Sequence, residues 1–382
     1  MRIVFLVQGE GKGHLTQAIS LGQILTEAGH EVVGALVGQS EGRTVPAFFK
    51  KEIGAPVFLH DAPNIIYNSD GGGLNLSRTL RTHLAALPRY LSSLRKIHQT
   101  IQSLEPDLLI NFYEIYGGLY NLRYGTKIPM VCIAHQYLLQ HPLFTFPPNS
   151  KVDRWLINFN TEATSWLCKK KLSLSFRSFP QANVGKNMVV PPLLRKAVRE
   201  LKPKDEDFFL VYMTHHSLSK QIISWHARHT EVKLQCFWDN AAAPELVQHN
   251  PNLIFRQIDA TKYLQLLATC KGLVTTAGFE SVCEAMYLGK PVMMVPVPQH
   301  FEQECNALDG VNSGAGVAAT TFDLSLFMAY LPKHKDQSAQ FRNWYMKGDN
   351  IFINAIEAYG NGTVSKIMPS QTIQAIGTLS PA

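Results

Sequence analysis

Short apolar runs alternate with segments of helical periodicity over the first half of the chain. The helical pattern is clearest between residues 14 and 28, and the glycine at position 29 predicts its end. Strands that alternate with helices in this way are typical of a parallel sheet with crossover helices. Residues 1–190 are therefore expected to form one Rossmann-like, doubly wound domain. The runs that predict its strands lie at residues 3–7, 32–37, 108–110 and 130–134.

A second series of the same kind follows a charged stretch with three prolines at residues 191–207, which is typical of an interdomain linker. Residues 208–338 are expected to form a second Rossmann-like domain, followed by a helix at residues 339–360 and a loose tail at residues 361–382. The predicted fold class is thus α/β, with two doubly wound domains facing a cleft. The expected strands of the second domain lie at residues 208–213, 232–237, 253–256, 272–275 and 291–295, and its expected helices lie near residues 219–229, 244–249, 261–269, 279–288 and 302–312.

The composition suits two domains with large cores. Of the 382 residues, 46% are hydrophobic and 17% are charged, which excludes a disordered chain. The 36 basic and 29 acidic residues leave a net charge of +7. This excess suits anionic ligands or an anionic membrane surface, and we expect no nucleic-acid partner from it.

The cysteines and the lengths of the apolar runs indicate in which cellular compartment the protein is expected. The six cysteines form no C-x-x-C pair, so free thiols in a reducing compartment are expected. No apolar run approaches the ~20 residues of a membrane span. The chain is predicted to be cytoplasmic, with peripheral contact at a membrane surface left open.

A glycine-rich loop at residues 8–13 joins the first expected strand to the first expected helix. Lys12 is followed by Gly13 and not by the Ser or Thr of a Walker loop, and the dinucleotide fingerprint G-x-G-x-x-G fails at its last glycine. ATP and NAD are therefore weakly supported. The loop leaves His14 at a helix N-terminus on the carboxyl edge of the sheet, where ligands bind. A polar cap contact without chemistry is the alternative for His14.

The helix expected to begin after Gly278 carries a candidate anion site. Its apolar residues follow i, i+3, i+4 spacing, so Ser281 and Glu284 share the opposite face and can address one ligand. The unpaired N–H groups after Gly278 favour a diphosphate. An ordinary crossover helix with polar surface residues is the alternative. Glu302 and Gln303 follow the next strand, where their side chains can bond sugar hydroxyls beside the diphosphate.

The glycine loop, the linker and above all residues 275–307 resemble the GT-B nucleotide-sugar glycosyltransferases. The similarity is strongest to the branch with the UDP-glucuronosyltransferases and the bacterial lipid-linked N-acetylglucosaminyltransferase of peptidoglycan synthesis. The resemblance implies that Glu284 holds the ribose, that the residues around Gly278 take the diphosphate, and that an acid–Gln pair holds the donor sugar. The loop at residues 257–258 would meet the uracil through its backbone. The implied donor-binding residues are Gln257, Ile258, Thr276, Gly278, Phe279, Glu280, Ser281, Glu284, His300, Glu302 and Gln303.

The first domain would supply the acceptor side. Gly13, Glu114 and His135 are expected to face the cleft, and His14, beside the glycine loop, is the candidate general base. Related sequences often carry an aspartate near Asn111, which would pair with such a histidine.

Two further departures from the resemblance lie on the donor side. Relatives in plants and animals have His-Cys-Gly where this chain has Thr276-Ala277-Gly278, so a diphosphate-binding histidine is absent. Glu302 stands where an aspartate is more usual.

A basic amphipathic helix is expected around residues 155–167, followed by three lysines at residues 169–171. Its apolar stripe is expected to pack on a core, because such stripes usually do, and docking on a membrane is the alternative.

The predicted function is inverting, metal-independent transfer of a sugar from a UDP-sugar to an acceptor hydroxyl on a lipid or a small molecule. No D-x-D-like acidic pair follows a strand of the second domain, so neither a metal nor a cofactor is expected. A UDP-sugar 2-epimerase or hydrolase of the same fold is one alternative. A non-catalytic nucleotide-sugar-binding partner of a membrane protein is the other.

Overall fold

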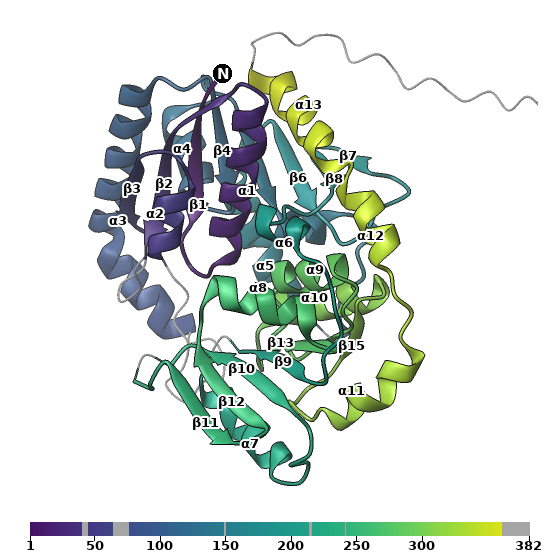
Figure 1. Cartoon of the computed structure of the whole chain (residues 1–382). Coiled ribbons are helices and arrows are strands. Elements are labelled where there is room, and N and C mark those ends of the chain that lie inside the picture. Colours follow the sequence, from purple (N-terminus) through teal and green to yellow (C-terminus); the bar gives the residue numbers. More distant parts are fainter. Residues whose placement is uncertain (40–44, 64–75, 149, 214–215, 241, 361–382) are drawn as a thin grey trace, which may run out of the picture.

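The computed structural model describes the chain except for residues 40–44, 64–75, 149, 214–215, 241 and 361–382. The expected tail therefore lies outside the described residues. Two parallel-rich sheets dominate the described part, one in each half of the chain (Figure 1). The predicted α/β class with two doubly wound units is confirmed.

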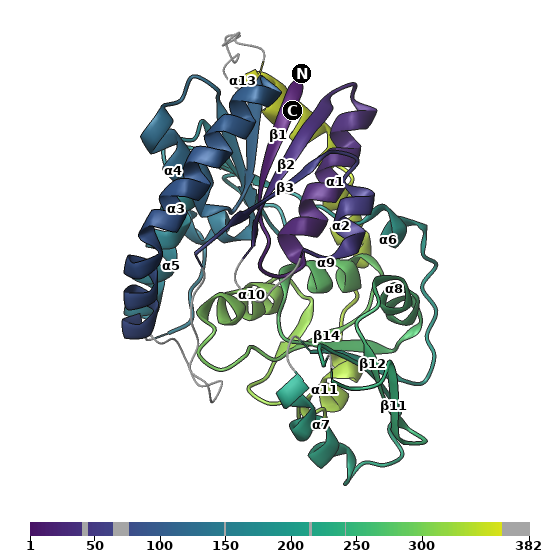
Figure 2. The ribbon, with the colours of Figure 1, turned by 90° about the vertical axis from the view of Figure 1, so that its left-hand side faces the viewer.

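The first sheet has eight strands in the order β3-β2-β1-β4-β5-β6-β8-β7. Ile3, Phe5 and Val7 of β1 face one helical layer and Val4 and Leu6 face the other, so the strand is apolar throughout. Helices α1, α2 and α13 (Gly348–Gly360) cover the first face, and α3, α4 and α5 cover the second (Figure 2). The strands are β1 (Arg2–Gln8), β2 (Glu31–Gln39), β3 (Val57–Asp61), β4 (Leu108–Phe112), β5 (Met130–Ala134), β6 (Lys170–Leu174), β7 (Asn183–Val184) and β8 (Asn187–Val190), and the helices are α1 (Gly13–Glu27), α2 (Ala47–Glu52), α3 (Leu76–Leu104), α4 (Ile115–Tyr124), the 3-10 helix η1 (His135–Gln140) and α5 (Lys151–Thr164).

The second sheet has seven strands in the order β11-β12-β10-β9-β13-β14-β15. Helices α8 and α9 pack on the face toward the first sheet, and α7 and α11 pack on the opposite face. The strands are β9 (Phe209–Tyr212), β10 (Leu234–Trp238), β11 (Leu246–Asn250), β12 (Leu253–Gln257), β13 (Gly272–Thr275), β14 (Val292–Met294) and β15 (Gly316–Ala318), and the helices are η2 (His216–Leu218), α7 (Ser219–His226), α8 (Ala260–Thr269), α9 (Phe279–Tyr287), α10 (Phe301–Asn312), α11 (Ser325–Tyr330) and η3 (Leu331–Lys333).

One sequence prediction about a secondary-structure element is wrong. The segment expected as a helix at residues 244–249 is the edge strand β11, which runs antiparallel to β12. Pairing with the edge of β12 gives this segment backbone hydrogen bonds along one side, which a local helical pattern does not foresee. The linker also contains a short helix, α6 (Lys196–Glu200).

The expected C-terminal helix is two helices, α12 (Ser338–Tyr345) and α13 (Gly348–Gly360). The chain thus returns from the second half to the first, and α13 packs against α1, β5 and β8 (Figure 1). Phe352 and Ile356 of α13 are buried in the core of the first domain. His30 at the end of α1 also contacts this helix, through Glu357 Oε1 at 3.0 Å.

The expectation that the apolar stripe of α5 packs on a core is wrong for its outer residues. Trp155 is 64% exposed and Phe159 is 56% exposed, and Val152, which precedes the predicted stripe, is 70% exposed. The rings of Trp155 and Phe159 stack on each other at 5.8 Å, since they lie one turn apart. We call these three residues the α5 apolar face.

Candidate active site

The site lies where the carboxyl ends of the first sheet meet the amino ends of α9 and α10. Figure 2 shows both helices directly beneath the first sheet. Gly13, His14 and His135 come from the segments after β1 and β5. The predicted acceptor-side residues Gly13 and His135 and the candidate base His14 are therefore brought together with the predicted donor residues.

His14 is the second residue of α1 and only 8% exposed. Its Nδ1 lies 3.3 Å from Gln17 Oε1, and its Nε2 lies 3.4 Å from Gln136 Nε2. The ring stacks on Tyr113 at 5.7 Å between centroids. Burial lowers the pKa of His14 to about 4, so the imidazole is neutral at pH 7 and can accept a proton.

Two side-chain amides of the first domain bond carboxyl groups of the second. Gln136 Nε2 donates to Glu302 Oε1 at 3.0 Å, and Gln17 Nε2 donates to Glu280 Oε1. Burial raises the pKa of Glu280 and that of Glu302 to about 7. Gly13 is needed for the second contact, because a Cβ at this position would lie 2.5 Å from Glu280 Oε2. Glu280, expected among the diphosphate residues, thus points at the first domain.

The amino end of α9 has the form expected of an anion site. Gly278 is its N-cap and no side chain caps the helix. Ser281 Oγ donates to Gly278 O at 3.0 Å and lies 3.4 Å from Thr275 Oγ1, so it borders the same turn. Thr276 is buried beside it.

Glu284 lies on the same helix and is only 3% exposed. Its Oε1 accepts a hydrogen bond from Arg195 Nε at 2.7 Å and lies 2.7 Å from Arg195 Nη2 in an ion pair. Burial raises the pKa of Glu284, and Arg195 opposes that shift. No sequence pattern indicated this role for Arg195, which lies 89 positions away in the linker.

The other expected donor residues hold the loops around this helix. Gln303 Oε1 accepts from the Val297 backbone at 2.8 Å, and His300 caps α10 by accepting from the Gln303 N–H. Gln257 donates to the carbonyl of Ala243 at 2.9 Å and thereby ties the end of β12, next to Ile258, to the preceding loop.

The acceptor-side residues divide into two places. Glu114 caps α4 and lies 3.9 Å from His60 Nε2, and both ring nitrogens of His60 are buried without a hydrogen bond in the described structure. His135 instead packs its ring on Phe279 of the second domain at 4.0 Å and bonds Leu174 O through Nδ1 at 2.8 Å. Burial lowers the pKa of His135 to about 4.

Asn111 holds backbone and does not reach the histidine. Its amide donates to Glu114 O at 3.0 Å and to Thr164 O at 2.7 Å, and the side chain is fully buried. The side chains that hydrogen-bond His14 are those of Gln17 and Gln136, and these two contacts were not predicted from the sequence. A signal existed for both, because Gln17 lies three residues after His14 on one helix and Gln136 directly follows His135.

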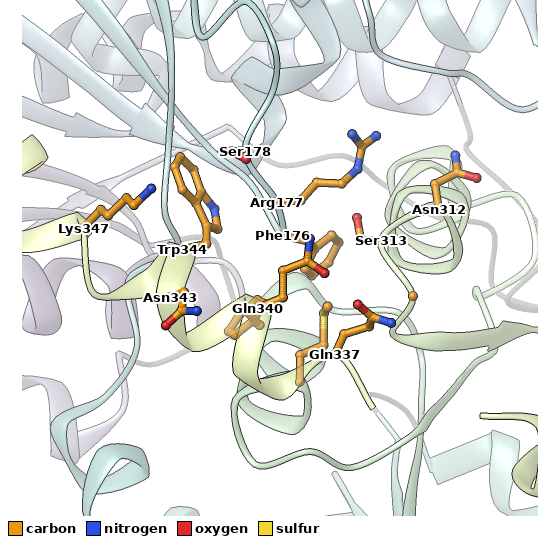
Figure 3. A pocket seen from close by; sticks show the side chains of 13 residues that line it. Phe176, Arg177, Ser178, Asn312, Ser313, Gln337, Gln340, Asn343, Trp344 and Lys347 are labelled. Atoms are coloured by element: carbon orange, nitrogen blue, oxygen red, sulfur yellow. The ribbon is translucent and has the colours of Figure 1, made fainter. Parts of the chain in front are cut away.

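A separate pocket of about 430 Å³ lies where the first domain, α10 and α12 meet (Figure 3). Phe176 lines the pocket and packs on Phe279, whose ring also stacks on His135. None of the predicted site residues lines it. Its walls are Phe176, Arg177, Ser178, Met286, Asn312, Ser313, Gly314, Gln337, Gln340, Phe341, Asn343, Trp344 and Lys347.

A family model described as glycosyl transferase family 1 matches residues 1–332. The chain belongs to this family. An uncharacterized glycosyltransferase of Methanosarcina acetivorans is 24% identical over 335 residues, which are 83% of each protein. The enzyme class predicted from the sequence, a glycosyltransferase, is confirmed.

Solved glycosyltransferases share the fold. The glycotransferase of kitacinnamycin matches with a TM-score of 0.63 and 15% identity over 94% of this chain and 98% of that one. Phytolacca americana UGT2, complexed with UDP-2fluoro-glucose and pterostilbene, matches with a TM-score of 0.58 and 12% identity over 94% of this chain and 99% of that one. The expected GT-B fold is confirmed. Among the helices that the structure describes, none is long and apolar enough to cross a membrane.

Proposed function

We propose that this glycosyltransferase moves a sugar from a UDP-sugar to an acceptor hydroxyl, with inversion at the anomeric carbon and without a metal. The observation that carries the proposal is the path from His14 Nε2 through Gln136 Nε2 to Glu302 Oε1, with steps of 3.4 and 3.0 Å. It places a neutral base beside the carboxyl group that is proposed to hold the donor sugar. A base and a donor sugar in contact are what a direct displacement requires.

In the proposed reaction the acceptor oxygen bonds the anomeric carbon as the bond to the diphosphate breaks. His14 Nε2 takes the acceptor proton, and the electron pair of the broken bond leaves on the diphosphate. The uncapped amino end of α9 at Gly278 supplies N–H donors and the helix dipole for that charge. Contacts between the domains around His14 would exclude water, which protects the donor from hydrolysis.

The nucleotide and its place are proposals as well. UGT2, a structural neighbour, binds a UDP-sugar analogue, and another, the spinosyn rhamnosyltransferase SpnG, is complexed with thymidine diphosphate. We assign the ribose to Glu284 and the diphosphate to Gly278 and Ser281, because these groups share one end of α9. The likeness to the UDP-glucuronosyltransferase branch favours uridine.

For the acceptor we propose a membrane lipid. The α5 apolar face exposes Trp155 and Phe159 among the cations Lys151 and Arg154, a combination that suits an anionic bilayer surface. The matched experiment sediments the protein with vesicles of phosphatidylcholine alone or with phosphatidylglycerol added. Binding that needs the anionic lipid and is lost in Trp155→Glu/Phe159→Glu supports the proposal. Equal sedimentation of the wild type and the variant contradicts the membrane-lipid proposal. A wild-type dimer that becomes monomeric in this variant contradicts it as well.

The function itself is tested by incubating purified protein with UDP-sugars and dTDP-sugars, with and without a lipid extract, in the presence of EDTA. Mass spectrometry that finds a glycosylated lipid and free UDP supports the proposal. Epimerised or hydrolysed donor at catalytic rates without an acceptor indicates the epimerase or hydrolase. Binding of UDP without any turnover indicates the non-catalytic partner, and transfer that EDTA abolishes contradicts metal independence.

A further inference from the structure

Five side chains, with His14 at the centre, form one continuous chain of hydrogen bonds. It starts at Glu302 in the second domain and passes through Gln136, His14 and Gln17 of the first domain. It ends at Glu280, again in the second domain. A single imidazole is therefore held from both sides by amides, each of which bonds a carboxyl group of the opposite domain.

The donors and acceptors along this chain fix where the proton of His14 lies. Gln17 Oε1 can only accept, so His14 Nδ1 must donate to it. Gln136 Nε2 can only donate, so His14 Nε2 must be the acceptor. Both contacts thus require the tautomer with the proton on Nδ1 and a bare Nε2. The reverse direction would need both carboxyl groups to donate, and hence to be protonated.

We infer that Gln17 is a positioning residue that keeps the proton of His14 on Nδ1, and that Glu280 of the opposite domain holds Gln17 in place. The inference rests on the proposed function for the role of His14 as the base. A base must present a lone pair, and this arrangement leaves the lone pair on Nε2, the atom beside Gln136 and Glu302.

This arrangement replaces the acid that would otherwise orient the histidine. Asn111, near the position where relatives often carry an aspartate, is fully buried and bonds the backbone of Glu114 and Thr164. Gln17 supplies the acceptor from the same helix as the base, and Glu280 accepts a hydrogen bond from the amide of Gln17. Because Glu280 belongs to the second domain, the base is oriented only while the two domains are in contact.

The first test reads the tautomer directly and needs no substrate. Long-range ¹H–¹⁵N spectra of histidine-labelled protein are recorded at pH 8, and the His14 signals are assigned by their loss in His14→Gln. We expect the proton on Nδ1 in the wild type and a loss of that preference in Gln17→Leu. A proton on Nε2 in the wild type, or an unchanged tautomer in folded Gln17→Leu, would overturn the inference.

A second test, which applies even if Gln17→Leu does not fold, exchanges the side chains of Gln17 and Glu280. In Gln17→Glu/Glu280→Gln, the new carboxylate accepts from His14 Nδ1 while the new amide donates to that carboxylate. The Nδ1 tautomer should persist, and the pKa of His14 should rise by at least one unit because a carboxylate now contacts the imidazolium. Gln17→Glu alone sets two carboxyl groups against each other and should lower the Tm. Equal behaviour of the single and double variants contradicts the inference.

Turnover of His14→Ala tests the proposed base, whereas the tautomer in the Gln17 variants tests the positioning role of Gln17. Full turnover in His14→Ala would remove the proposed base whatever the tautomer is. Lost turnover in His14→Ala with an unaltered tautomer in the Gln17 variants would keep the base and reject Gln17 as its positioning residue.

Discussion

Arg195 donates a hydrogen bond from Nε to Glu284 Oε1 at 2.7 Å, and its Nη2 lies 2.7 Å from the same carboxylate oxygen. One side chain comes from the linker and the other from α9, so this ion pair ties the connection between the domains to the proposed ribose site. The second carboxylate oxygen of Glu284 makes no bond to Arg195, which suits it to accept from a ribose hydroxyl.

Arg195→Ala should lower the thermal stability, because it leaves the buried carboxylate of Glu284 without a counter-charge. Removing one partner of a buried pair typically costs about 3–5 kcal/mol. Differential scanning fluorimetry at pH 7 measures the Tm, and Arg195→Lys, which keeps the charge, should lose less. A Tm equal to that of the wild type would show that Glu284 does not depend on this partner.

Glu284→Ala should weaken UDP binding by roughly ten-fold or more, since a hydrogen bond to a charged group is worth about 1.5–3 kcal/mol. Isothermal calorimetry with UDP measures the affinity. The control is Glu200→Ala, the same change at an exposed position in α6. Unchanged affinity in a folded variant would move the ribose away from Glu284.

His14→Ala should lower kcat by at least ~10²-fold, because a positioned base typically contributes 10²–10⁴ to the rate. Affinity for UDP should stay, since the proposed nucleotide site belongs to the second domain. Steady-state assays with saturating donor and acceptor provide the measurement, and His249→Ala in the exposed edge strand is the matched control. Wild-type turnover would move the role of base to His135 or Glu114.

Glu302→Gln should reduce transfer while UDP affinity is retained, because the side chain is proposed to contact only the sugar. The substitution preserves a carbonyl oxygen that can accept from Gln136 and removes only the charge. Gln303→Ala should spare UDP binding too. It should also loosen the loop at Val297, whose N–H then loses its acceptor. Equal losses of UDP and UDP-sugar affinity, measured by calorimetry, would place these residues at the nucleotide.

The double variant Glu280→Gln/Glu302→Gln should gain stability relative to the wild type as the pH rises from 5 to 8. Burial raises the pKa of both carboxyl groups from 4.5 to about 7, so the folded state holds protons that the unfolded state has released, and rising pH favours unfolding. His14 and His135, with pKa values of about 4, act oppositely below pH 6.5 in both proteins. The difference in Tm should grow by at least ~2 °C. A Tm difference that stays constant between pH 5 and 8 would contradict the raised pKa of these two carboxyl groups.

Local pattern was sufficient for much of the fold and for the helix of the donor site. The placement of Gly13 and His14 at a strand-to-helix turn, and of Ser281 and Glu284 on one helix, follows from spacing within a few residues. Arg195, Gln136 and Glu280 obtain their roles from contacts between segments 89 to 263 positions apart, which no local pattern encodes.

The two wrong predictions have the same origin. Residues 244–249 became a strand because β12 offered an unpaired edge, and the α5 stripe stayed exposed because no element covers its outer turn in the described structure. In both segments the presence or absence of a neighbouring element determined the secondary structure or the exposure, and local periodicity contains no information about such neighbours.

The return of α13 to the first domain has a consequence for how the protein is made. Phe352 and Ile356 complete a core whose first members are Ile3 and Phe5, and Gly360 lies against Met1. During synthesis the first domain therefore keeps part of its apolar surface exposed until the second domain and α13 have left the ribosome. A chain truncated before α13 should be prone to aggregation even though both sheets are intact.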